Sequence, residues 1–219
     1  MLKEPSSSRL SFDELKTLIT EKWPESFYAG SDWSSLRFTT GCAELDQLFP
    51  AGGIPYGQLI EVAGDVSSGK TSMVFVLLAA ITRSGTAAYI DLGGSFFPPA
   101  AVSGGVDIER MLVVRPDTLA SGLRATELIF RHRLACCAVL DLVGHRLPLP
   151  YTLLHRLRLQ TIRAKGMVIF LTENNSTLIP ASMTSLRLEI TRQSQRRLSA
   201  TVTRSRVSAQ GVTAEVHLS

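Results

Sequence analysis

Short apolar runs alternate with longer helical patterns along most of the chain. Runs of strand length lie at residues 59–63, 87–92, 111–114, 135–143 and 167–171, and patterns of helical length or spacing lie at 73–81, 117–133 and 150–164. Strands that alternate with helices in this way predict an α/β fold built on a doubly wound, mostly parallel sheet. Ligands of such sheets lie at the carboxyl ends of the strands.

The pattern changes after Leu186. Residues 186–191, 198–203 and 212–218 are short alternating stretches that polar turns separate. Such stretches are typical of antiparallel strands with one buried face. We therefore expect a C-terminal antiparallel meander at one edge of the parallel sheet.

The first 36 residues follow neither pattern. Ser11 with Glu14 three residues later has the form of a capping box, so a helix is expected to begin there and to end before Pro24. We assign residues 1–36 to an N-terminal helix and linker, and residues 37–219 to one nucleotide-binding core. The helix either packs on its own core or docks on a partner, and the sequence leaves both possibilities open.

One glycine-rich segment carries recognisable chemistry. Residues 64–71 read GDVSSGKT, the pattern of a P-loop, and they follow an expected strand and open an expected helix. In such loops the lysine (Lys70) binds the outer phosphates and the hydroxyl residue (Thr71) reaches Mg²⁺. ATP and Mg²⁺ are therefore the expected ligands. The expected nucleotide-binding residues are Gly64, Asp65, Val66, Ser67, Ser68, Gly69, Lys70, Thr71 and Ser72.

A P-loop site needs an acidic residue at the end of a second buried strand. Asp141 follows five apolar residues, and a carboxylate there is costly unless it is paired or near a metal. We expect Asp141 to help hold Mg²⁺; the alternative is that it caps a turn at Gly144. Pro98-Pro99 and Gly104-Gly105 are expected to bracket a short helix or turn where the base rests.

The segments around the P-loop resemble the RecA recombinase family in order and spacing. They read TTGCAELD (39–46), GGIPYGQLIE (52–61), YID (89–91), GVDI (105–108) and LVVRPDT (112–118). The resemblance covers about residues 37–191 and is most specific over 39–118. It implies a RecA-like fold and a role in DNA repair.

The departures from that family concern hydrolysis. The glutamate that orients the attacking water in RecA falls at Gly93, and glycine has no side chain to serve as a base. Glu173, at the polar switch position, and Glu61 are the candidate replacements. The two segments that match the DNA-binding loops, residues 144–150 and 174–185, are short. Whether the chain is a slow ATPase or only binds ATP stays open.

A small, loop-trimmed RecA-like chain resembles ImuA-type proteins, which accompany translesion DNA polymerases in damage-inducible mutagenesis cassettes. That resemblance implies an ATP-binding accessory of DNA repair and translesion synthesis in the SOS response. Its expected partners are the RecA recombinase or the polymerase module, and it is a possible homo-oligomer. The alternative is an active DNA-dependent ATPase of recombinational repair.

Charge is divided unevenly along the chain. Residues 1–120 carry 9 basic and 14 acidic side chains, whereas residues 121–219 carry 14 basic and 5 acidic ones. A basic half suits a polyanionic partner such as DNA, although solvated surface arginines or an acidic protein partner fit it too. The candidate contacts to DNA or a partner are Arg156, Arg158, Arg163, Lys165, Arg192, Arg196, Arg197, Arg204 and Arg206.

The cysteines and the hydropathy of the chain indicate the cellular compartment in which the protein is expected. The chain has three cysteines, and two of them, Cys136 and Cys137, are adjacent within an apolar run. This usage suits a reducing compartment better than a disulfide framework. No apolar run approaches the roughly 20 residues that span a bilayer. We expect a cytoplasmic protein without a membrane segment.

Overall fold

The computed structural model describes residues 11, 14, 17, 21, 37–49, 52–206 and 209–218. It divides the chain into two units, residues 1–35 and residues 36–219. In the first unit, the backbone N–H of Ser11 donates to Oε2 of Glu14 at 2.8 Å, and the N–H of Glu14 donates to Oγ of Ser11 at 3.2 Å. This reciprocal pair confirms the expected capping box. Pro24 and the expected linker lie outside the described residues.

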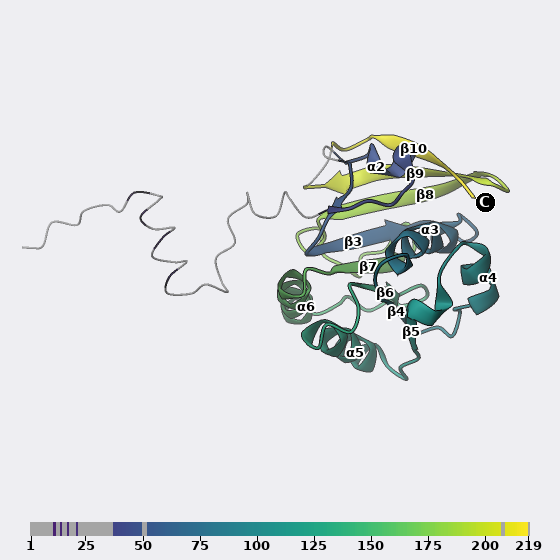
Figure 1. The fold of residues 1–219 in the computed structure, drawn as a ribbon. Helices are drawn as coiled ribbons and strands as arrows, with labels where there is room; N and C mark the ends of the chain where they lie inside the picture. Colours follow the sequence, from purple (N-terminus) through teal and green to yellow (C-terminus); the bar gives the residue numbers. More distant parts are fainter. Residues whose placement is uncertain are drawn as a thin grey trace, which may run out of the picture. The chain divides into compact units, whose positions relative to one another are not determined.

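The second unit is built on a sheet of eight strands, counted over the described residues (Figure 1). In chain order the strands are β3 (Gln58–Ala63), β4 (Ala87–Asp91), β5 (Met111–Val114), β6 (Cys137–Asp141), β7 (Met167–Thr172), β8 (Leu186–Ser194), β9 (Arg197–Ser205) and β10 (Thr213–His217). Their spatial order is β10-β9-β8-β3-β7-β6-β4-β5. Pairing is parallel from β8 through β5 and antiparallel from β8 to β10. The expected α/β sheet with a C-terminal meander is confirmed.

Helices cover both faces of the sheet. Helix α3 (Lys70–Thr82) packs on one face, and α5 (Leu119–Arg131) and α6 (Tyr151–Arg163) pack on the other. Successive side chains of β3 point to opposite faces of the sheet and so belong to two different cores. Ile60 and Val62 join the core beneath α3, whereas Leu59 joins the core beneath α6. None of the helices in the described part of the chain is long and apolar enough to cross a membrane.

Several short elements complete the unit. The bounds are β1 (Arg37–Phe38), β2 (Ile54–Pro55), α2 (Ala43–Asp46), α4 (Pro98–Ser103) and a 3₁₀ turn at Ile108–Arg110. Helix α4 confirms the short helix expected between the proline and glycine pairs, with proline at its first turn. β1, β2 and α2 were not expected, because elements of two to four residues are too short to show a period.

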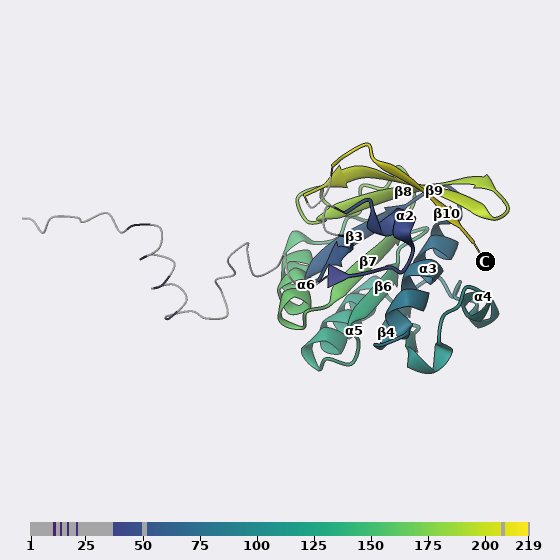
Figure 2. The same ribbon diagram turned by 45° about the horizontal axis from the view of Figure 1, so that its top comes forward.

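Register brings the ends of the central strands to one edge. Ala63 at the end of β3 pairs with Thr172 of β7, and Asp91 at the end of β4 pairs with Asp141 of β6. The P-loop leaves β3 at this edge and continues into α3. The β8–β9 hairpin reaches the same edge, and Figure 2 shows it above α3. This edge is therefore where the candidate chemistry gathers.

Candidate functional site: a phosphate-binding loop

The P-loop ends in a conformation that leaves helix α3 open at its N-terminus. Gly69 is the N-cap with φ of 87°, in the left-handed region that favours glycine, and no side chain caps the helix. Ser67, two residues earlier, also has a positive φ of 62°. The first N–H groups of α3 and the positive end of its dipole therefore face the loop, which is the arrangement that binds anions.

Lys70 lies beneath this loop. Its Nζ donates to the carbonyl oxygens of Gly64 at 3.1 Å and Asp65 at 3.0 Å, and the side chain is buried. Within the described residues no carboxylate forms an ion pair with Lys70. A buried ammonium held only by carbonyls leaves a positive charge that a phosphate can neutralise.

The loop is closely packed around Gly64 and Ser68. A Cβ at position 64 would lie 2.3 Å from Oγ of Ser68 and 2.8 Å from the carbonyl oxygen of Ile190, so only glycine fits. Oγ of Ser68 is buried and has no hydrogen-bond partner among the described residues. An unpaired buried hydroxyl is costly, and an oxygen of a bound phosphate would satisfy it.

The β8–β9 hairpin contacts the P-loop through Arg192 and Leu198. Nε of Arg192 donates to the carbonyl oxygen of Ser67 at 3.1 Å. Leu198 packs so closely that a Cβ on Gly69 would lie 2.4 Å from it. The sequence placed Arg192 among the candidate DNA or partner contacts, whereas the structure places it against the P-loop. No local signal could have shown this, because 125 residues separate Arg192 from Ser67.

Asp141 is surrounded by hydrogen-bond donors. Its Oδ2 accepts from the hydroxyl of Tyr89 at 2.9 Å and from Oγ of Ser95 at 2.8 Å, and its Oδ1 accepts from N–H of Val143 at 3.2 Å. Burial, and then the charge of Asp141, raise the pKa of Tyr89 far above its usual value, so Tyr89 remains a neutral donor. The carboxylate thus does cap the turn that follows β6. Its Oδ1 accepts a single hydrogen bond, from Val143, and has the capacity to accept another.

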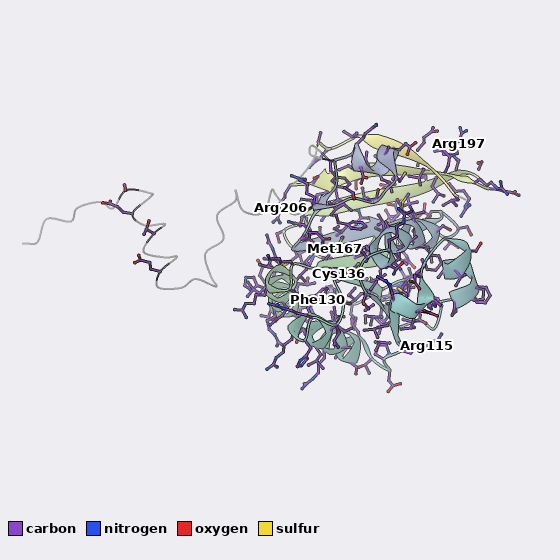
Figure 3. All side chains as sticks on the ribbon, in the orientation of Figure 1. Arg115, Phe130, Cys136, Met167, Arg197 and Arg206 are labelled. Carbon is purple, nitrogen blue, oxygen red and sulfur yellow. The ribbon has the colours of Figure 1, made fainter. Side chains whose placement is uncertain are left out.

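Asp91 holds the turn after β4. Its side chain accepts from N–H of Ser95 at 2.8 Å, from N–H of Phe96 at 3.2 Å and from Nε of Arg115 at 3.1 Å. Figure 3 labels Arg115 at this end of β5. An aspartate that binds N–H groups a few residues ahead is a common turn device. From the sequence, Asp91 served only as part of the resemblance to RecA, and this role was not predicted, although Gly93-Gly94-Ser95 shortly after it signals a turn.

Comparison with known proteins bears on this loop and its sheet. The family described as RecA N-terminal domain matches residues 31–149, just over half of the chain. The chain belongs to this family. It is 35% identical to the RecA protein of Clostridium tetani over 111 residues, 37% identical to that of Clostridium acetobutylicum and 38% identical to that of Clostridium novyi. The matched segment covers 50% of this chain and 32% of each relative, so the chain matches about a third of their length.

Gly93 stands where the RecA resemblance places a catalytic glutamate. The residue is exposed, its φ is not in the left-handed region, and a Cβ there would meet nothing within 4 Å. The position therefore has room for a side chain but carries none. In this member of the RecA N-terminal domain family, the turn held by Asp91 offers no acid or amide at that point.

The two candidate replacements lie in different surroundings. Glu61 is fully buried on the α6 face of β3, where Nη1 of Arg187 lies 2.5 Å from its Oε1 and Thr172 also donates to it. Such burial and pairing give no support to a catalytic role. Glu173 is partly exposed and pairs with Nη1 of Arg146 at 3.3 Å, which joins the segments after β6 and β7. Both roles remain predictions.

The candidate DNA-contact residues fall in three places. One group lies on or after α6 (Arg156, Arg158, Arg163, Lys165), a second lies toward the tip of the β8–β9 hairpin (Arg192, Arg196, Arg197), and a third lies at the other end of β9 (Arg204, Arg206). Figure 3 shows Arg197 and Arg206 at opposite ends of the antiparallel strands. The structure does not bring the three groups together on one surface.

Proposed function

We propose that the chain is a RecA-like accessory protein of DNA repair that binds ATP and Mg²⁺ and hydrolyses ATP slowly or not at all. It acts by docking on the RecA recombinase or on a translesion polymerase module in the cytoplasm during the SOS response. The observation that carries the proposal is the loop in which Lys70 has no acidic partner and Ser68 has no hydrogen-bond partner among the described residues. The core that performs this role is residues 37–219.

The donor set fits a magnesium nucleotide. Lys70 and the first N–H groups of α3 suit the phosphates, and Thr71 follows the lysine directly. Asp141 would accept a hydrogen bond from a water molecule bound to Mg²⁺ rather than ligate Mg²⁺ directly, because its Oδ2 already accepts hydrogen bonds from two hydroxyls. Bound Mg²⁺ would neutralise phosphate charge, and Thr71 would place a hydroxyl oxygen beside it.

A cavity between α3 and α4 suits the base. Its volume is about 320 Å³, and Ser72, Phe75 and Ala100 are among its lining residues. Ser72 is the residue after Thr71, so the cavity begins beside the phosphate-binding loop. Ala100→Phe would fill it and is expected to weaken binding of ATP but not of inorganic triphosphate. Equal weakening of both ligands would place the base elsewhere.

Nucleotide titration tests the main proposal. We expect purified full-length protein to bind ATP in a magnesium-dependent manner by calorimetry, and Lys70→Ala to abolish that binding. Lys165→Asn is the matched control, because it removes an exposed lysine at a φ of 51° that asparagine tolerates. Absence of binding by the wild-type chain, or unaltered binding by Lys70→Ala, would refute the proposal.

Turnover separates the proposal from the alternative of an active DNA-dependent ATPase. Loss of a water-positioning group commonly removes a factor of about 10² or more. With Gly93 in that place, we expect slow turnover that single- or double-stranded DNA does not stimulate. Robust DNA-stimulated hydrolysis that Lys70→Ala abolishes would establish the alternative instead.

Direct DNA contact is a separate part of the proposal. Arg196 and Arg197 are exposed at the hairpin tip and are the strongest candidates. If they bind phosphates, the affinity for DNA falls steeply with salt and falls again in Arg196→Ala/Arg197→Ala. Unchanged DNA binding in that variant would assign these arginines another role.

A further inference from the structure

A groove runs between α5 and α6, the two helices that cover the sheet face opposite α3. Its cavity has a volume of about 560 Å³. Three turns of α5 and the facing turns of α6 line it, and neither the P-loop nor the turn after β4 takes part. The residues that matter below are Arg124, Glu127, Leu128, Arg131, Leu153 and Arg156.

The floor of the groove is apolar. Leu128 of α5 is 43% exposed, and Leu153 of α6 is partly buried and packs against the core beneath α6. A single exposed leucine is ordinary, but here it lies in a concave surface together with Leu153. Concave apolar surface of this kind is typical of a site that receives an apolar side chain.

The rim of the groove is basic. Arg124 and Arg131 are seven residues apart on α5, so they share a face and lie about 10 Å apart along the helix axis. Both are exposed, and neither forms an ion pair with any residue that the structure describes. On the α6 side, Nη2 of Arg156 lies 2.5 Å from Oε2 of Glu127. With three arginines and one glutamate, the groove carries a net positive charge.

Glu127 adds a specific requirement. While its Oε2 binds Arg156, its Oε1 is buried and has no hydrogen-bond partner within the described part of the chain. A buried acceptor without a partner is rare in folded proteins. An occupant of the groove that supplies an N–H or O–H would satisfy it.

We propose that this groove is a docking site for an acidic amphipathic helix of a protein partner. Apolar side chains of that helix contact Leu128 and Leu153, carboxylates two turns apart pair with Arg124 and Arg131, and one donor reaches Glu127. Helix-in-groove recognition of this kind combines apolar contacts with flanking charge pairs. DNA suits the groove less well, because its phosphates offer nothing to an exposed leucine and are repelled by Glu127. The inference rests on the proposed accessory role, for which it names the docking surface.

Fluorescence anisotropy of the full chain with a synthetic probe tests the site. The probe is a fluorescein-labelled 15-residue helical peptide with leucines along one face and glutamates two turns apart on the flanks. We expect saturable binding, and at least about tenfold weaker binding to Arg124→Glu/Arg131→Glu and to Leu128→Asn. Arg110→Glu, an exposed charge reversal outside the groove, should bind as the wild type does. A probe with lysine in place of glutamate should not bind.

Several outcomes would overturn the proposal. The first is that the wild type does not bind the glutamate probe. The second is that the groove variants bind the probe as tightly as the wild type does. The third is that the groove variants lose affinity for duplex DNA but keep their affinity for the probe. ATP titration of the same variants distinguishes the two proposals. Loss of probe binding with intact ATP binding supports the groove in a folded protein, whereas a wild type that binds the probe but not ATP retains the groove and refutes the nucleotide site.

Discussion

The hydroxyl of Tyr89 donates a hydrogen bond to Oδ2 of Asp141 at 2.9 Å. The two residues lie on neighbouring parallel strands, β4 and β6, and both are almost completely buried. Because a buried carboxylate is costly without donors, this bond and the one from Ser95 allow Asp141 to remain at the end of β6. The same bonds fix the carboxylate beside the strand edge from which the P-loop emerges.

Replacement of Tyr89 tests how much that bond contributes. Tyr89→Phe removes one donor from a buried acceptor, and we expect the free energy of unfolding to fall by about 1–3 kcal/mol. Urea denaturation measures it. Tyr151→Phe is the matched control, because Tyr151 is 55% exposed and its loss should change stability little. Equal effects of the two replacements would show that the bond to Asp141 does not stabilise the fold.

Stability should decline at alkaline pH. Burial raises the pKa of Tyr89 and of the Cys137 thiol above their usual values. A group with a raised pKa in the folded state stabilises fully below its unfolded pKa and loses that contribution as pH rises toward the folded value. The free energy of unfolding is therefore expected to fall above about pH 8.5, where unfolded thiols ionise, and more steeply above about pH 10.

Urea denaturation under reducing conditions at pH 7, 9 and 10.5 checks this expectation. Cys137→Ala should flatten the first part of the decline, and Tyr89→Phe should flatten the second. Tyr151→Phe should retain the wild-type slope. A wild-type stability that stays constant to pH 10.5 would contradict the assignment of both buried groups.

Much of the fold follows from local patterns in the sequence. The β3–P-loop–α3 unit could be predicted because an apolar strand, a glycine motif and a helical run follow one another directly. The interactions that complete the site could not, since they join distant residues. Tyr89 and Asp141 are 52 residues apart, and Arg187 and Glu61 are 126 apart. Arg192 and Arg206 look alike in the sequence, yet only pairing of the meander places Arg192 on the P-loop.

Gly64→Ala tests the close packing of the loop. The added Cβ would lie 2.3 Å from Oγ of Ser68, so the loop must shift. We expect ATP affinity to fall by about tenfold or more, because the loop N–H groups no longer converge. Gly211→Ala, at a positive φ of 81° with no atom within 4 Å, carries only a conformational cost and should leave ATP affinity intact. Unaltered titration of Gly64→Ala would show that the loop adapts.

The buried pair of Glu61 and Arg187 gives a stability prediction. Arg187→Met leaves the carboxylate of Glu61 buried with Nη2 of Arg204 at 3.7 Å as its remaining charge partner. We expect a loss of about 3–5 kcal/mol by urea denaturation. The double variant Glu61→Leu/Arg187→Met should recover part of it, because no buried carboxylate remains and Arg204, which loses its partner, is partly exposed and still donates to Thr184.

An exposed pair serves as the comparison for that experiment. Arg197 and Glu215 are 3.6 Å apart and half-exposed, so Arg197→Ala should cost less than about 1 kcal/mol. A double variant at Glu61 and Arg187 that is less stable than Arg187→Met alone would contradict the view that the unpaired carboxylate causes the loss.

Gly93→Glu asks whether one missing side chain limits hydrolysis. The position is exposed, and a Cβ there meets no atom within 4 Å, so the turn after β4 can accept the residue without strain. If this chain binds ATP but lacks a group to orient water, the variant should hydrolyse ATP about 10- to 100-fold faster than the wild type, with similar ATP affinity. A coupled phosphate-release assay measures the rate.

Gly93→Gln is the control, because it fills the same space without a carboxylate and should turn over more slowly than Gly93→Glu. Equal rates in both variants, or no gain in Gly93→Glu while ATP still binds, would mean that hydrolysis is limited elsewhere, for example by the two hydroxyls that occupy Oδ2 of Asp141.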